Sequence, residues 1–322
     1  MSLLKILSTA LVLGSFLGTA DAVRAQDYPN KPVRLILGPS PEATPRLIAE
    51  RVSKELGQPI IVDPRLGAGG EIAAKATSGS PADGYTLLYA SSNFSLATAM
   101  QLGSFNFAED FEPIGRVGTS AYVLVVHPSL PVKTPAELIA YAKANPGKIN
   151  CGSSGMATPG HLSCEMLKSM AGIDIVHVPY KNAAASMTAL MGNEVNISIT
   201  VSTAARAQIE AGTIRGLAVT TAEPSPLIPN LPALQDTIPG FVVHGWGSLV
   251  APKGTPKEVI EKVNAALMTA LKDPDTHAKI SSYGMRPSDP HSAADFGAFI
   301  RGEIARWNKT IDEAGVKRGK PE

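Results

Sequence analysis

Runs of apolar residues alternate with stretches of helical periodicity along most of the chain. The apolar run 32–37 is followed by 46–56, where apolar residues recur every three or four positions and Gly57 follows as a stop signal. The same order repeats, which predicts strands and helices in alternation. Further strands are predicted at 59–62, 85–90, 121–127, 148–152, 173–179, 194–201, 214–220 and 241–250. Further helices are predicted at 67–76, 136–144, 159–170, 186–191, 255–271 and 293–314.

Apolar strands that alternate with helices are typical of α/β proteins, in which helices cover both faces of a parallel sheet. A chain of 322 residues exceeds one average domain and falls short of three, so two lobes are expected. The segment 224–232 contains four prolines and is expected to be an extended connector that leads back to the first lobe. We therefore predict an α/β fold of two lobes, each a mostly parallel sheet flanked by helices. The predicted lobes are 26–125 with 246–322, and 126–245.

The first 25 residues have the features of a secretory signal peptide. Lys5 precedes the apolar stretch 6–17, and Val23 and Ala25 occupy the −3 and −1 positions of a cleavage site before Gln26. This stretch is shorter than the roughly 20 apolar residues that span a membrane, so a cleaved leader fits better than the alternative, a retained anchor. Segment 1–25 therefore predicts an exported protein.

Charge excludes one class of partner. Loss of Lys5, Arg24 and Asp21 with the leader changes the 29 basic and 28 acidic side chains to 27 of each, and no long run of Lys and Arg is present. A neutral chain without a cluster of Lys and Arg cannot neutralise many phosphates of nucleic acid, so no nucleic-acid partner is expected. A charged ligand must then be held by local groups rather than by the field of the whole protein.

Two loops at predicted strand ends lead into helices that begin with Thr-Pro. Thr44 and Thr158 suit the N-cap position, and Pro45 and Pro159 suit the first helical position. A helix N-terminus presents free backbone N–H groups and the positive end of the helix dipole, which suits a carboxylate. Two such ends, one in each lobe, would hold a small anion between them; the alternative is ordinary capping. The candidate ligand residues are Pro39, Ser40 and Thr44 in the first loop and Ser154, Gly155, Met156, Ala157 and Thr158 in the second.

Three more polar segments follow predicted strands. They lie where the sheets of α/β proteins bind ligands, at the carboxyl ends of the strands. Lys181 is the cation near these segments, and solvated surface is its alternative role. The candidate ligand residues here are Ser91, Ser92 and Asn93, then Lys181, Asn182 and Ala183, then Thr200 and Ser202.

Motifs of common enzymes and metal sites are missing from the sequence. It contains no Gly-x-Ser-x-Gly elbow, no phosphate-binding lysine loop and no His-Glu-x-x-His, and its six histidines are scattered without metal spacing. We therefore expect a protein that is not an enzyme and holds no cofactor and no metal. A secreted α/β hydrolase is a weaker alternative.

Two features near the second loop leave alternatives open. His161 lies in the first turn of the predicted helix 159–170, where the helix dipole disfavours a positive ring, so a neutral imidazole is expected. It either contacts ligand or packs inside the lobe. Cys151 and Cys164 flank the same loop. They either form a disulfide in an oxidising compartment or remain two small buried thiols.

Seven short motifs are spread along the mature chain: Tyr28-Pro-x-Lys-Pro-Val-Arg-Leu-Ile, Leu56-Gly-Gln-Pro-Ile-Ile-Val62, Gly67-Ala-Gly-Gly70, Asp83-Gly-Tyr-Thr-Leu-Leu88, Ala144-Asn-Pro-Gly-Lys148, Val176-His-Val-Pro-Tyr-Lys181 and Glu303-Ile-Ala-Arg-Trp307. With these motifs the chain resembles one known family, the Bug-type substrate-binding proteins of tripartite tricarboxylate transporters. The resemblance covers essentially the whole mature chain. The first loop departs from the family pattern, since it is shorter, has one glycine where two are usual, and places Glu42 where the family has Asp.

The resemblance implies a periplasmic solute-binding protein with a two-lobed, type II-like periplasmic-binding-protein fold. It implies a monomer that closes like a Venus flytrap on a small organic carboxylate, either a di- or tricarboxylate or an aromatic acid, and delivers it to the membrane permease subunits of the transporter. Closure is expected about the strands near residues 125 and 245. In this family, backbone amides and small polar side chains of loops on both lobes grip the carboxylate. A carboxylate sensor subunit for a membrane signalling protein is the alternative.

Overall fold

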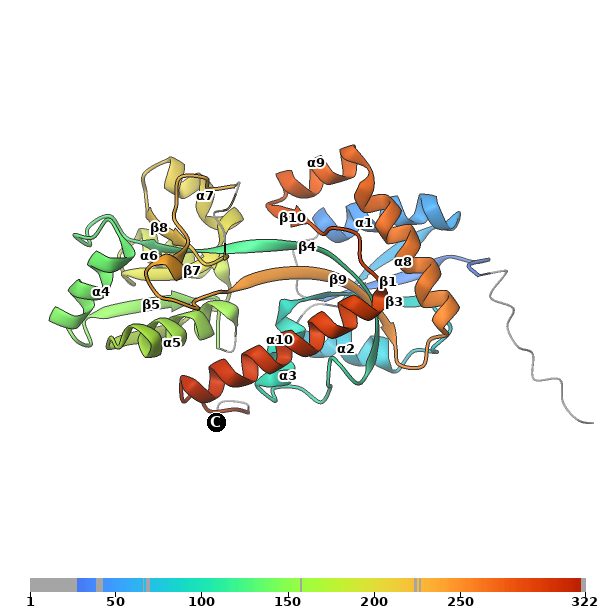
Figure 1. Cartoon of the computed structure of the whole chain (residues 1–322), viewed down its shortest axis with the longest axis horizontal. Helices are drawn as coiled ribbons and strands as arrows, with labels where there is room; N and C mark the ends of the chain where they lie inside the picture. The colour runs from blue at the N-terminus through green and yellow to red at the C-terminus, as the bar shows by residue number, and fades with distance from the viewer. Residues whose placement is uncertain are drawn as a thin grey trace, which may run out of the picture.

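The structure, a computed structural model, describes residues 28–38, 43–65, 67, 70–156, 158–222, 225 and 227–319. The predicted leader 1–25 lies outside these residues, as do Pro39, Ser40, Glu42 and Ala157. In the part of the chain that is described, strands and helices form two lobes joined by two long strands (Figure 1). The predicted two-lobed α/β fold is confirmed.

The first lobe is built on the strand that follows Pro32. Strand β1 (Val33–Leu37) lies between β2 (Ile60–Pro64) and β3 (Thr86–Ser91) and runs parallel to both. Strand β9 (His244–Pro252) pairs antiparallel with β3 and with the first part of β4 (Phe111–Val126). The short strand β10 (Met285–Pro287) also pairs antiparallel with β4.

The second lobe repeats this arrangement. Strand β5 (Ile149–Ser153) lies between β6 (Ile175–Pro179) and β7 (Ile197–Val201) and runs parallel to both. The last part of β4 pairs antiparallel with β7 and with β8 (Arg215–Val219). A 3-10 helix, η3 (Leu234–Asp236), lies on the connector between β8 and β9.

The two crossing strands make the sheets mixed rather than mostly parallel. Strand β4 pairs with β9 through Ala121 and with β7 from Tyr122 onward, so the chain passes from one lobe to the other at this point. Strand β9 runs in the opposite direction. Because each strand enters its second lobe against the local strand direction, each lobe contains antiparallel pairs. The residue boundaries predicted for the lobes stay a prediction.

Helices cover both faces of each lobe (Figure 1). In the first lobe, alternate residues of β1 face two different cores: Leu35 packs with α1 and α8, and Ile36 packs with α2, α3 and α10. The first-lobe helices are α1 (Ala43–Leu56), α2 (Glu71–Ser78), α3 (Ser92–Ala99), α8 (Lys257–Lys272), α9 (Pro274–Ser282) and α10 (Ala293–Glu313). The second-lobe helices are α4 (Pro135–Ala144), α5 (Pro159–Ala171), α6 (Ala183–Met191) and α7 (Ser202–Glu210).

Helix α10 contacts both lobes. Its residues Phe296 and Ile300 lie in a first-lobe core, whereas Trp307 and Ile311 belong to a cluster that includes Leu162 of α5 in the second lobe. The second cluster also contains Leu96 of α3 in the first lobe, so it joins apolar side chains of both lobes on this side of the molecule. None of the helices in the described ranges is long and apolar enough to span a bilayer.

Candidate functional site

Strand direction brings the predicted ligand segments to one place. Strands β1 and β3 run parallel to β4, which leaves the first lobe for the second, so their carboxyl ends point toward the second lobe. Strand β7 runs antiparallel to β4, and β5 and β6 run parallel to β7, so their carboxyl ends point back toward the first lobe. The segments that follow these five strands therefore face one another across the space between the lobes.

Each of these segments leads directly into a helix. Helices α1 and α3 begin after β1 and β3, and α5, α6 and α7 begin after β5, β6 and β7. The positive ends of five helix dipoles consequently point into the inter-lobe space. Such an arrangement attracts a carboxylate without a guanidinium group and offers backbone N–H groups to bind it.

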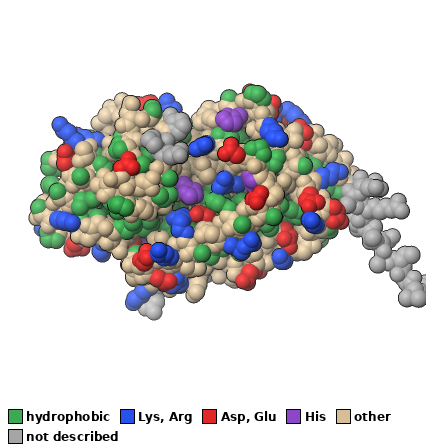
Figure 2. Space-filling view, in the orientation of Figure 1, with side chains coloured by type: hydrophobic (Ala, Val, Ile, Leu, Met, Phe, Trp, Pro, Cys, Tyr) green, Lys and Arg blue, Asp and Glu red, His purple; other side chains and the backbone are tan. Residues whose placement is uncertain are grey.

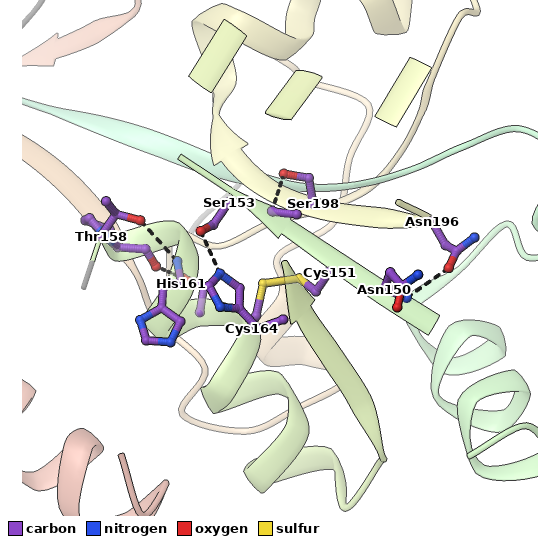
Figure 3. The surroundings of a disulfide bond; sticks show 12 residues. Asn150, Cys151, Ser153, Thr158, His161, Cys164, Asn196 and Ser198 are labelled. Carbon is purple, nitrogen blue, oxygen red and sulfur yellow. Dashed lines mark hydrogen bonds between the residues drawn. A yellow bond between two sulfur atoms is a disulfide. The ribbon is translucent and has the colours of Figure 1, made fainter. Parts of the chain in front are cut away.

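The segment between β5 and α5 is held by a compact set of hydrogen bonds (Figure 3). Thr158 caps α5: its Oγ1 accepts the N–H of His161 at 3.3 Å and donates to the carbonyl of Gly155 at 2.8 Å. Gly155 has φ 128°, a conformation that favours glycine. The predicted cap is therefore present, and it fixes the turn that contains Ser154, Gly155 and Met156.

The buried His161, the half-buried His177 and a serine lie beneath this turn. The rings of His161 and His177 lie with centroids 4.2 Å apart, and Ser153 Oγ lies 2.7 Å from His177 Nε2. Burial lowers the pKa of both imidazoles, and repulsion from His161 helps to bring that of His177 to about 4. Both rings are neutral at neutral pH. Because Ser153 is 1% exposed and also accepts the N–H of Gly155, this pair organises the turn rather than presenting a nucleophile.

A disulfide closes the same segment covalently (Figure 3). Cys151 on β5 and Cys164 on α5 are bonded, with Cα atoms 6.2 Å apart. Of the two states that the sequence left open, the structure has the disulfide. The turn with Thr158 lies inside the loop that the disulfide closes, so the strand end and the helix start are held together.

Three predicted positions differ in detail from their expected roles. Thr44 is not the N-cap of α1, because the helix begins at Ala43 and Thr44 lies buried in its first turn. Pro45 is accepted there since N–H groups in the first helical turn have no partner within the helix. Ser92 and Asn93 are not in a loop: Ser91 ends β3, and the next two residues open α3. The polar residues 91–93 were predicted to be a loop, whereas the helix begins at Ser92.

The remaining predicted residues divide into a surface group and a buried group. Lys181 and Asn182 are exposed, and the Asn182 side chain caps α6 by accepting the N–H of Ala185 at 2.8 Å. Ala183 opens α6, and Thr200 lies near the end of β7. Ser202, the first residue of α7, is fully buried, and its hydroxyl has no hydrogen-bond partner among the described residues. Its hydroxyl is therefore unsatisfied, but it is closed off from the inter-lobe space as the lobes stand in this structure.

A separate cavity of about 710 Å³ lies between the lobes, beside the crossing strands. It extends from Thr119 and His244 on these strands to Met285 on β10 and Leu227 after β8. Figure 2 shows the face on which a notch separates the two lobes. None of the predicted ligand residues in the described ranges lines this cavity. The facing helix starts stay the predicted anion site, because they present backbone N–H groups and the positive ends of helix dipoles.

Among the described residues, no group of three or more His, Cys, Asp or Glu side chains is placed to hold a metal ion. Ser153 and His177 support the turn at Thr158 and were not predicted from the sequence. Their signal was present, because His177 belongs to the motif Val176-His-Val-Pro-Tyr-Lys181.

Comparison with known proteins gives one consistent result. The model of the family described as "Tripartite tricarboxylate transporter family receptor" matches residues 44–316. Protein BugT of Bordetella pertussis is 32% identical to this chain over 327 residues, which cover 98% of this chain and 99% of that protein.

Two similar solved structures contain small acids. R. palustris Rpa4515 with adipate has a TM-score of 0.81 and 33% identity and covers 91% of this chain and 100% of its own. MatC from Rhodopseudomonas palustris with bound malate has a TM-score of 0.76 and 25% identity and covers 88% of this chain and 100% of its own.

Proposed function

This chain belongs to the tripartite tricarboxylate transporter receptor family, and from this premise we propose that it captures a small organic carboxylate between its lobes. It acts in the periplasm as a monomer and delivers the acid to the membrane permease subunits of its transporter. The observation that carries the proposal is the convergence of five helix N-termini on the space between the lobes. This geometry supports an anion as ligand, and the proposed role is binding without a chemical reaction.

The ligand class that fits best is an aliphatic dicarboxylate. Two structural neighbours contain adipate and malate, and each of these acids has two carboxylates separated by a short chain. Helix starts on opposite lobes supply one anion site for each end of such a molecule. The small side chains at the second-lobe turn, with Ser154 and Gly155, leave room for the chain between the carboxylates.

Capture proceeds by rotation of the lobes about β4 and β9. These strands cross between the lobes at Ala121, Tyr122 and His244, close to the hinge positions expected near residues 125 and 245. Closure brings the two sets of helix starts onto the same ligand and removes water from the carboxylates, which strengthens each N–H contact. Ligand binding and closure are thus the same event.

A thermal-shift screen of organic acids, sugars and amino acids tests this function. A ligand that binds only the folded state raises the melting temperature as its concentration rises. We expect dicarboxylates to raise the melting temperature of the protein, with neutral sugars as the matched negative set. A response to sugars with none to any carboxylate would overturn the proposal.

A further inference from the structure

One close contact joins the lobes away from the predicted ligand turns. Gly284, between α9 and β10 of the first lobe, meets Thr203, the second residue of α7 in the second lobe. A Cβ placed on Gly284 would lie 1.8 Å from Thr203 Cγ2, 3.3 Å from Thr203 Cβ and 3.5 Å from Leu227 Cδ1. The first distance is impossible for real atoms, so a side chain at position 284 would require Thr203 Cγ2 to move, either by rotation of the Thr203 side chain or by displacement of the lobes.

The contact lies close to the hinge. Met285 pairs with Ser120 of β4, and Val201 pairs with Tyr122, two residues further along the same strand. Gly284 and Thr203 therefore meet beside the point where β4 passes between the lobes. Close to the axis about which the lobes rotate, a small displacement requires a large rotation. One added methyl group at this contact would therefore open the cleft between the lobes widely.

The contact also bears on a candidate ligand residue. Thr203 follows Ser202, whose buried hydroxyl has no hydrogen-bond partner among the described residues and is a predicted ligand group. Gly284 and Leu227 both line the inter-lobe cavity of about 710 Å³, so the contact bounds that cavity. A residue of the first lobe thus contacts the start of α7, the helix that Ser202 opens.

We propose that Gly284 is a positioning residue for ligand capture: its missing side chain lets the lobes close until Gly284 meets Thr203, and this contact sets the limit of closure and the place of the α7 N-terminus. The proposal rests on the proposed function for its effect on affinity. The predicted effect of Gly284 on the angle between the lobes does not depend on the proposed function.

Gly284→Ala is the direct test, and the chain offers a matched control. Gly284 has φ +85°, so alanine there is strained whatever the space around it. Gly254 has φ +86°, but a Cβ on it would have only Ala82 Cβ, at 4.0 Å, near it. Gly254→Ala therefore carries the same backbone strain without a contact between lobes. Both variants are expected to lower the melting temperature, and only G284A is expected to change the lobe angle.

The lobe angle is measured as the distance between spin labels on Lys54→Cys in α1 and Lys143→Cys in α4, by pulsed electron paramagnetic resonance. G284A is expected to shift the distance distribution of the ligand-free protein toward the more open form, and G254A to leave it unchanged. With adipate as the probe, G284A should raise the Kd about tenfold or more, because the closed population falls.

A second substitution supplies rescue and guards against a folding defect. Thr203→Ser removes Cγ2, so G284A combined with T203S should restore the distances and bring the Kd close to that of T203S alone. Thr203→Leu enlarges the exposed side chain on the α7 side of the contact. It leaves Gly284 and its positive φ unchanged, so it adds no backbone strain there, and it should open the lobes as G284A does. Equal distance distributions for G284A and G254A, or no rescue by T203S, would overturn the proposal. If adipate binds no variant while the distances shift as described, only the proposed ligand is wrong.

Discussion

Trp246 on β9 donates its indole N–H to the carboxylate of Glu303 on α10, with Nε1 3.3 Å from Oε2. The carboxylate is 5% exposed and also accepts two hydrogen bonds from Arg306, at 2.9 and 3.0 Å. Arg306 in turn donates to the carbonyl of Val242 at 3.0 Å, just before β9. This network ties a crossing strand to the helix that packs against both lobes, and it gives a structural role to the motif Glu303-Ile-Ala-Arg-Trp307.

Glu303→Gln should destabilise the protein strongly. Burial alone would raise the pKa of Glu303, but the hydrogen bonds and charge of Arg306, with His244 and Trp246, lower it below its ordinary value. The substitution leaves the Arg306 guanidinium without its counter-charge. Because the Arg306 side chain is partly exposed to water, we expect the free energy of unfolding to fall by about 2–3 kcal/mol. Urea unfolding at neutral pH measures it.

The pH dependence gives a second check on Glu303. A carboxyl whose pKa is lowered in the folded state stabilises the protein above its unfolded pKa, and this stabilisation is lost as pH falls through the folded pKa. Wild type should therefore lose more stability than E303Q when the pH falls below the ordinary value of 4.5. Glu313→Gln, at an exposed pair with Lys309 on the same helix, is the control and should change stability by less than about 0.5 kcal/mol.

Thr158→Ala should separate capping from ligand binding. Loss of an N-cap hydroxyl costs about 1 kcal/mol of stability. Thr134 caps α4 in the same way, with Oγ1 accepting the N–H of Glu137 at 3.1 Å and proline at the next position, but it lies away from the inter-lobe space. We expect T158A and T134A to lose similar stability and only T158A to weaken dicarboxylate binding, as measured by calorimetry. Equal affinities for the two variants would show that the turn is not part of the site.

Removal of the disulfide should affect both stability and the site. The pair Cys151→Ala and Cys164→Ala opens a loop with a sequence separation of 13 residues, which lowers the free energy of unfolding by about 2–4 kcal/mol. Since the loop contains the Thr158 turn, dicarboxylate affinity should also fall. A reductant should lower the melting temperature of wild type and leave that of the double variant unchanged; an equal effect on both would contradict the assignment.

The histidine pair should make the second lobe sensitive to acid. The pKa of His177 is lowered to about 4 by burial and by His161, whereas the unfolded chain takes up the proton near the ordinary value of 6.5. The neutral ring is therefore favoured in the folded state, and stability falls as pH decreases from 6.5 toward 4. His177→Asn, which keeps a polar partner for Ser153, should flatten the melting-temperature profile over this range. A profile as steep as that of wild type would contradict a His177 ring that stays neutral in the folded protein.

The regular alternation of apolar runs and helical periodicity was enough to predict the two-lobed α/β fold and most of its elements. It missed the first part of β4, because Glu112, Arg116 and two glycines interrupt the apolar run between 111 and 120. It also missed α3 and α7, which start directly after strands with small residues, and α9, whose composition is polar.

The position of the site followed from the strand ends, but its details depend on tertiary contacts. A Thr-Pro pair marked both α5 and α1, yet only Thr158 is an N-cap, since helix limits depend on the residues that precede them. The contact of Gly284 with Thr203 joins residues 81 positions apart across two lobes, as the chain numbering shows. No local pattern in the sequence predicts it.

The most direct test of the central claim is a titration of isotope-labelled protein with adipate, followed by the backbone amide resonances. If helix starts on both lobes bind the acid, saturable shifts with a single Kd are expected at Asn93 of α3 and at Gly160 and His161 of α5. Shifts confined to one lobe, or shifts centred on Thr119 and His244 in the cavity beside the crossing strands, would contradict it.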